Sequence, residues 1–91
     1  MFRIGVICAG LTDTEGAAAI PEILWEFHNR PRHLNPQCVW RSPVLALVVE
    51  SPFDSTGVEV LEDFKEAVYA RVQYSSGMLR FLVESVAEFI P

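Results

Sequence analysis

Residues Val44 to Glu50, with the sequence VLALVVE, most constrain what this chain can fold into. The first six of these seven positions are apolar. A continuous apolar run of this length is typical of a β-strand that is buried on both faces, in the middle of a sheet. The 91 residues of the chain are too few to bury two separate cores. We therefore predict a single domain, residues 1–91, built around this strand.

Further patterns predict the elements that surround it. Thr12 and Glu15 have the spacing of a capping box, which marks a helix start. Pro21 predicts either a kink in that helix, which we favour, or a helix that is regular only from about Ala19. In chain order we expect a strand at 2–9, a helix to about Asn29, a short strand at 37–41, a strand at 44–50, a helix with its apolar stripe from Val60 to Val72, a strand at 78–86 and a tail at 87–91.

This order of elements closes most simply as an α+β ferredoxin-like plait (βαββαβ). Its antiparallel four-stranded sheet has the strand order 4-1-3-2, with two helices on one face. Strand alternation puts the bulkier side chains, such as Ile4, Leu47 and Phe81, beneath the helices. The segments DTEG (13–16) and DSTG (54–57) echo each other, as a duplicated unit would. The plait is a widely reused fold, so it implies no function by itself.

The face of the predicted sheet that lacks helices is apolar at its centre and charged at its margin. The centre comprises Gly5, Ile7, Ala9, Val44, Ala46, Val48 and Leu82, and the margin comprises Arg3, Glu50, Arg80 and Glu84. Such a patch is typical of a protein contact, and a two-fold pairing would let arginines meet glutamates. We therefore predict a non-catalytic interaction module, as a homodimer in preference to a complex with another protein. The alternative is a moderately apolar surface of the kind that small plaits leave open.

A second hypothesis is a small-ligand or anion-binding sensor or enzyme at one end of the sheet. The topology puts the loop with Arg30, Arg32 and His33 near the loop with Asp54, Ser55 and Thr56. Guanidinium groups beside a helix N-terminus can hold an anion. The competing interpretation, which we favour, is that Asp54 caps the following helix and pairs with an arginine.

Metal and covalent chemistry have little support in the sequence. His28, His33 and Cys38 are the only soft ligand set, and their spacing matches no compact zinc site. Nucleophile-elbow, phosphate-loop and dinucleotide motifs are absent. In the expected strand order Cys8 and Cys38 are too far apart for a disulfide. We expect no metal, no cofactor and no enzymatic activity.

Net charge and hydropathy argue against nucleic acid and membranes as partners. The net charge is −5, and no basic stripe suggests nucleic acid. No apolar run approaches the length of a membrane span. With two cysteines and no convincing signal peptide, we expect a cytoplasmic protein with free thiols. The acids on the second helix leave a further alternative, an acidic inhibitor or immunity-type protein that docks a basic partner.

Overall fold

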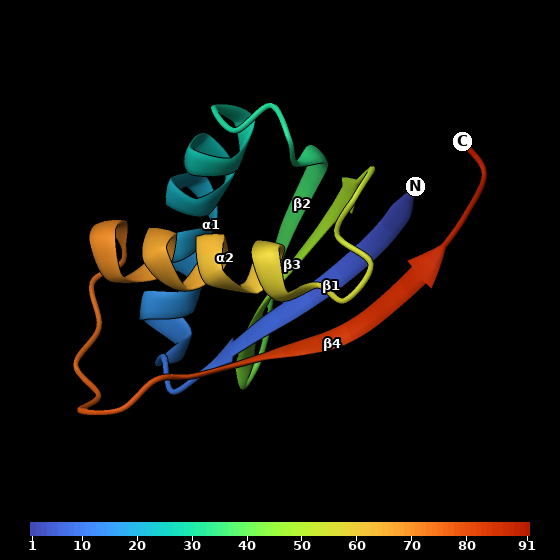
Figure 1. Cartoon of the computed structure of the whole chain (residues 1–91). Helices are drawn as coiled ribbons and strands as arrows, with labels where there is room; N and C mark the ends of the chain where they lie inside the picture. Colours follow the sequence, from blue (N-terminus) through green and yellow to red (C-terminus); the bar gives the residue numbers. More distant parts are fainter.

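The computed structural model describes residues 1–91 and has two layers, a four-stranded antiparallel sheet and two helices. In chain order the elements are β1 (Phe2–Ala9), α1 (Asp13–His28), β2 (Leu34–Arg41), β3 (Val44–Ser51), α2 (Val58–Arg71) and β4 (Arg80–Glu88). The strands lie in the order β2-β3-β1-β4, which is the predicted order read in reverse. Both helices lie on one side of the sheet (Figure 1). The ferredoxin-like arrangement is therefore confirmed.

The start of α1 follows the sequence closely. The Thr12 hydroxyl accepts the Glu15 amide at 3.1 Å, and the Glu15 carboxylate accepts the Thr12 amide at 2.9 Å. This reciprocal pair satisfies two backbone donors that the first helical turn leaves free. The helix continues through Pro21 and ends at His28, with Asn29 as its C-cap. The expected helix is confirmed to within a residue at its end.

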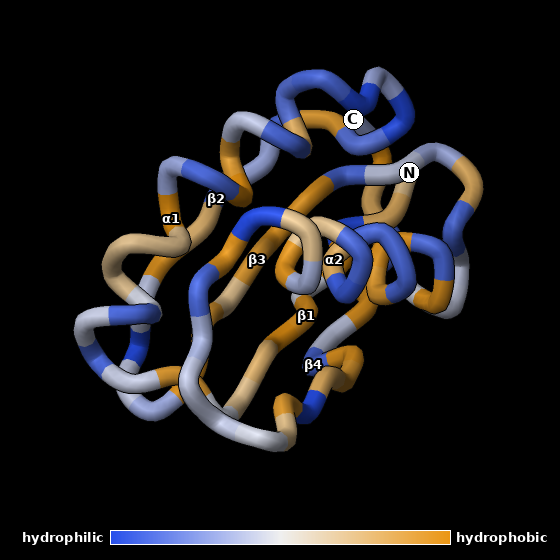
Figure 2. Tube along the Cα trace, turned by 90° about the vertical axis from the view of Figure 1, so that its left-hand side faces the viewer, coloured by the Kyte–Doolittle hydropathy of each residue, from blue (hydrophilic) through white to orange (hydrophobic).

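The core lies between the sheet and the helices, where strand alternation predicted it. The largest fully buried side chains include Ile4 and Val6 of β1, Leu45, Leu47 and Val49 of β3, Ile23 and Phe27 of α1, and Val60, Phe64 and Val68 of α2. Figure 2 shows the hydrophobic positions concentrated along β1 and β3, with hydrophilic positions in the loops. Neither helix has the length and apolar content that crossing a bilayer requires.

The prediction for the last strand was two residues out of place. It spans 80–88, not 78–86, and includes part of the segment expected to be a tail. The reason is register: Phe2 and Arg3 at the start of β1 pair with Glu88 and Ala87. The Phe89 amide adds a bond to the Met1 carbonyl at 2.9 Å. Backbone groups on β1 need partners, and this need extends β4 beyond its apolar pattern.

Candidate functional site

The open face of the sheet, the side without helices, carries an apolar row that crosses all four strands. Val39 pairs with Ala46, Ala46 with Ile7, and Ile7 with Leu82. Residues opposite each other in neighbouring strands project to the same face. Val39 and Leu82, at the two ends of this row, are each 49% exposed. Three of the four row members were predicted as open-face residues, and Val39 on the edge strand was not.

The two rows that flank this apolar row on the open face contain both polar and apolar residues. One flanking row reads Gln37, Val48, Gly5 and Ser85, and the other reads Arg41, Val44, Ala9 and Arg80. The apolar members lie on the two central strands, while the polar ones lie on the outer strands. Of these polar residues only Arg80 was predicted for the margin. No other helix or strand covers the middle of the face.

Two of the predicted margin residues, Arg3 and Glu50, bind each other within the chain. They are register partners on β1 and β3, and their side chains lie 3.3 Å apart. The Asn35 amide also donates to Glu50 at 2.9 Å. These contacts, the bond from Asn35 first, lower the pKa of Glu50. Arg3 lies over the Phe89 ring, 4.7 Å from its centroid, so this pair is already held in place.

Glu84, a third margin residue, pairs with Arg41 at 3.0 Å. Arg41 lies on β2 and Glu84 on β4, the two outer strands of the sheet. Their ion pair therefore passes over the two central strands. This ion pair could not be predicted from the sequence, because its two residues are far apart along the chain and meet only across the sheet. Of the predicted margin charges, Arg80 alone has no ion pair in the structure.

The second predicted site is arranged differently from the expectation. Arg30, Arg32 and His33 of the α1–β2 loop meet Asp63 of α2, not Asp54. His33 Nε2 lies 2.6 Å from Asp63 Oδ2, and Arg30 lies 3.1 Å from Asp63 Oδ1. Arg32 also pairs with Glu59. The His33 side chain is only 1% exposed, so it is withdrawn from any ligand in the surrounding solvent.

Asp54 is buried and serves the start of α2. Its two carboxylate oxygens accept the amides of Gly57 at 3.0 Å and Val60 at 2.9 Å. The capping role favoured from the sequence is thus present, but the expected arginine partner is not. Ser55 and Thr56 are exposed, and neither forms a hydrogen bond with the arginines.

The same loop engages part of the acidic face of α2. Arg30 binds Glu66 as well as Asp63. The sequence placed these acids on a solvated face, and Glu62 and Glu66 are exposed there, while the loop encloses most of Asp63. A shallow groove of about 310 Å³ remains over the loop, lined by Asn29, Arg30, Pro31, Arg32 and Asp63. Asp63 is the acid of this face that the loop engages most fully.

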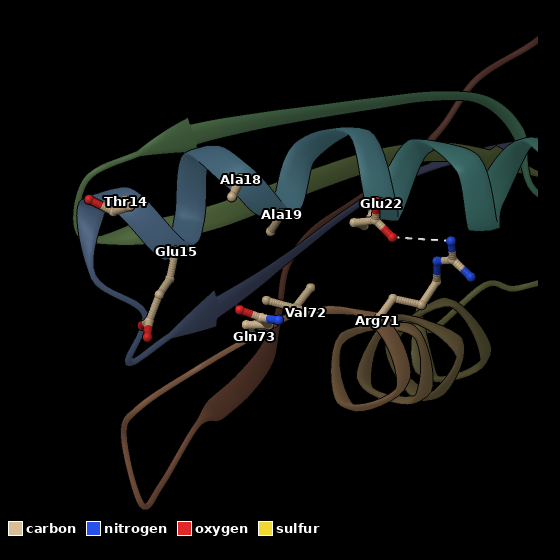
Figure 3. A pocket seen from close by; sticks show the side chains of 8 residues that line it. All are labelled: Thr14, Glu15, Ala18, Ala19, Glu22, Arg71, Val72 and Gln73. Atoms are coloured by element: carbon tan, nitrogen blue, oxygen red, sulfur yellow. Dashed lines mark ion pairs between the residues drawn. The ribbon is translucent and has the colours of Figure 1, made fainter.

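A larger hollow of about 420 Å³ lies between α1 and the end of α2. Figure 3 shows Ala18 and Ala19 on α1 facing Val72 and Gln73, with Glu15 extending from the helix toward the linker after α2. At its other end Arg71 pairs with Glu22 at 3.1 Å. The Arg71 guanidinium also stacks on Trp25, 4.3 Å from the ring centroid. The one cation in the hollow is therefore held from two sides.

The remaining reactive side chains show no catalytic arrangement. Cys8 and Cys38 are free and buried. Burial raises the pKa of Cys8 to about 11 and that of Cys38 to about 12, so both are neutral thiols near pH 7, not nucleophiles. No three His, Cys, Asp or Glu side chains are grouped as metal ligands.

Together these features define a small α+β domain of the ferredoxin-like arrangement, with a largely apolar sheet face that no helix covers and that one ion pair crosses. No protein-family model, curated protein or solved structure matches the chain.

Proposed function

We propose that the chain is a non-catalytic interaction module that pairs with a second copy through the open face of its sheet. The observation that carries this proposal is the row Val39, Ala46, Ile7 and Leu82, which is apolar from one edge of the sheet to the other. A sheet face meant for water is mostly polar. An apolar row of this kind gains from being covered by another such face.

The size of the face sets the strength of the contact. Strands lie about 4.8 Å apart and rise about 3.4 Å per residue, so the open face covers about 500 Å² on each copy. The total of about 1,000 Å² is at the lower limit for a specific interface. We therefore expect a weak dimer, with a dissociation constant in the micromolar range.

The ion pair between Arg41 and Glu84 further limits the affinity. A second face packed over it would remove water from both charges, and this desolvation opposes binding. Replacing the two side chains together by methionine should therefore strengthen the dimer. The arginine–glutamate contacts across the join, expected from the sequence, are not needed, because Arg3 and Glu84 already have partners.

Light scattering across a concentration series tests this proposal. Val39→Glu should give monomers, because it puts a charge into the row at a half-exposed site where folding is little affected. Ala46→Glu should do the same, but Ala46 is only 5% exposed, so this variant also needs a folding check. Val58→Glu is the matched control, because Val58 is exposed on α2, in the helix layer.

A wild-type chain that stays monomeric throughout the micromolar range would refute the proposal. So would a Val39→Glu variant that associates as the wild type does through the same face. A cytoplasmic location stays a prediction; the buried free thiols Cys8 and Cys38 support it, since a reducing compartment preserves thiols.

A further inference from the structure

The hollow between α1 and the end of α2, about 420 Å³ in volume, is the larger of the two hollows on the chain. Its volume lies within the range of small-molecule sites, about 300–1,000 Å³. The hollow exists because α1 carries the small side chains Ala18 and Ala19 there, and because the chain leaves α2 at Arg71 and becomes extended at Val72. Figure 3 shows these alanines and Val72 near the middle of the hollow, with Glu15 and Arg71 toward opposite ends.

One end of the hollow holds a carboxylate that has no cationic partner. Glu15 forms no ion pair within the chain, and its side chain accepts the Thr12 amide at 2.9 Å. This bond, followed by contacts with Ser75, lowers the pKa of Glu15, so the carboxylate is ionised near pH 7. Val72 and Gln73 also line the hollow, directly after α2, and the last carbonyl groups of a helix carry the negative end of its dipole. A positively charged group is therefore favoured at this end.

The other end holds an arginine and a glutamate side by side. Arg71 Nη2 lies 3.1 Å from Glu22 Oε1, and both side chains are partly exposed. A guanidinium has five N–H donors, and the Nε of Arg71 is buried without a hydrogen-bond partner. Stacking on Trp25 holds the plane of the group. Such a pair suits a zwitterion, because the arginine can hold a carboxylate and the glutamate an ammonium group.

The distance between the two ends limits the length of the ligand. Glu15 and Glu22 are separated by about two turns of α1, roughly 10 Å along the helix axis. A hydrogen bond of about 3 Å at each end leaves room for an aliphatic stem of roughly four methylene groups. The apolar side chains of Ala18, Ala19 and Val72 lie between the two ends and can contact such a stem.

We propose that this hollow binds a free basic α-amino acid, with L-lysine as the member of the class that fits best. Its side-chain ammonium group contacts Glu15, its α-carboxylate contacts Arg71 and its α-ammonium group contacts Glu22, while its stem lies along Ala18 and Val72. The hollow lies in the helix layer, away from the open face of the sheet, so this inference does not depend on the proposed dimer. Because the site is open to solvent, we expect a dissociation constant of about 1 mM.

Amide chemical shifts during a titration with L-lysine hydrochloride test this site, with sodium chloride at equal ionic strength as the salt control. The amide signals of Ala18, Val72 and Gln73 should shift and saturate, while those of Val39 and Leu82 on the open face should not. Three analogues each lack one of the contacting groups. Norleucine lacks the side-chain ammonium, cadaverine lacks the α-carboxylate and Nα-acetyl-lysine lacks the α-ammonium, so each should bind about fivefold more weakly.

Variants of the chain assign the contacts to particular residues. Glu15→Gln keeps an oxygen for the Thr12 amide but removes the charge, so it should weaken L-lysine binding about fivefold and leave norleucine binding unchanged. Glu62→Gln is the matched control for net charge, because Glu62 is exposed on α2 outside the hollow. Ala18→Leu should abolish binding by filling the hollow. Ala17→Leu, at the neighbouring exposed position that does not line the hollow, should bind as the wild type does.

Several outcomes would overturn the inference. The absence of a saturable shift up to about 20 mM L-lysine, or equal affinities for L-lysine and norleucine, would refute the basic amino acid as the ligand. Equal binding by Ala18→Leu and Ala17→Leu would show that the hollow is not the site. If Nα-acetyl-lysine binds as tightly as L-lysine, the ligand is the C-terminal lysine of a peptide and not a free amino acid. Light scattering measures open-face pairing separately, so neither result decides the other.

Discussion

Gly16 in α1 lies directly beneath the Trp40 ring of β2, and this contact allows a sharp test of the packing. A Cβ atom at position 16 would overlap three atoms of the six-membered ring. Non-bonded carbon atoms need about 3.5–4.0 Å, so the indole would have to move. Trp40 is also tethered, because its Nε1 donates to Asp13 at 2.9 Å.

Two opposing effects decide the result of Gly16→Ala. Alanine is favoured over glycine inside a helix by about 1 kcal/mol. Against this, forcing extra volume into a packed site costs about 1–3 kcal/mol, and a lost or bent hydrogen bond costs a further ~0.5–1.5 kcal/mol. The sum is a net destabilisation of about 1–3 kcal/mol, which for a domain this small lowers Tm by about 4–8 °C per kcal/mol.

Urea denaturation followed by tryptophan fluorescence measures this loss. Gly77→Ala is the matched control, because no atom lies within 4 Å of its added Cβ. It should leave stability unchanged or raise it by up to about 1 kcal/mol through the unfolded state. Trp40→Leu, which removes the overlapping ring atoms, should recover part of the loss in Gly16→Ala. If Gly16→Ala is as stable as wild type, the proposed close approach of α1 to β2 is incorrect.

Three other measurements probe caps and thiols. Asp54→Ala leaves the amides of Gly57 and Val60, at the start of α2, without their acceptor. It should lower the free energy of unfolding by about 1–3 kcal/mol in urea denaturation, with Asp54→Asn less damaging. The hydrogen bond from the Thr12 amide lowers the pKa of Glu15. The stabilisation from this bond is therefore present above the ordinary glutamate pKa and is lost as the pH falls through the lower pKa of the folded protein. Denaturation at pH 6 and pH 3 should show Glu15→Gln to be less sensitive to acid than the wild type. Because burial raises the pKa values of Cys8 and Cys38 to about 11 and about 12, an aromatic disulfide reagent at pH 8 should label both thiols only after denaturation.

Several parts of the fold could be predicted because their causes are local. The Thr12–Glu15 capping box acts within one turn, and the apolar run from Val44 fixes a central strand wherever its neighbours lie. The short connection between β2 and β3 favours an antiparallel hairpin. Chain handedness then leaves few ways to close the sheet.

The candidate sites were harder to predict, because they depend on side chains that meet across the fold. The α1–β2 loop was expected near Asp54, but Arg30 and His33 bind Asp63, about two helical turns further along. Arg41 was treated as the end of an edge strand, yet it reaches Glu84 on the opposite edge. Neither pairing has a spacing in the sequence that reports it.

The sequence alone determined the order of strands and helices, the core face of each strand and the apolar centre of the open face. These features follow from hydrophobic periodicity and capping, which act between neighbours in the chain. Only the tertiary structure decided which charges already have partners within the chain. Ion pairs depend on distances between remote residues, and those distances exist only once the sheet has closed.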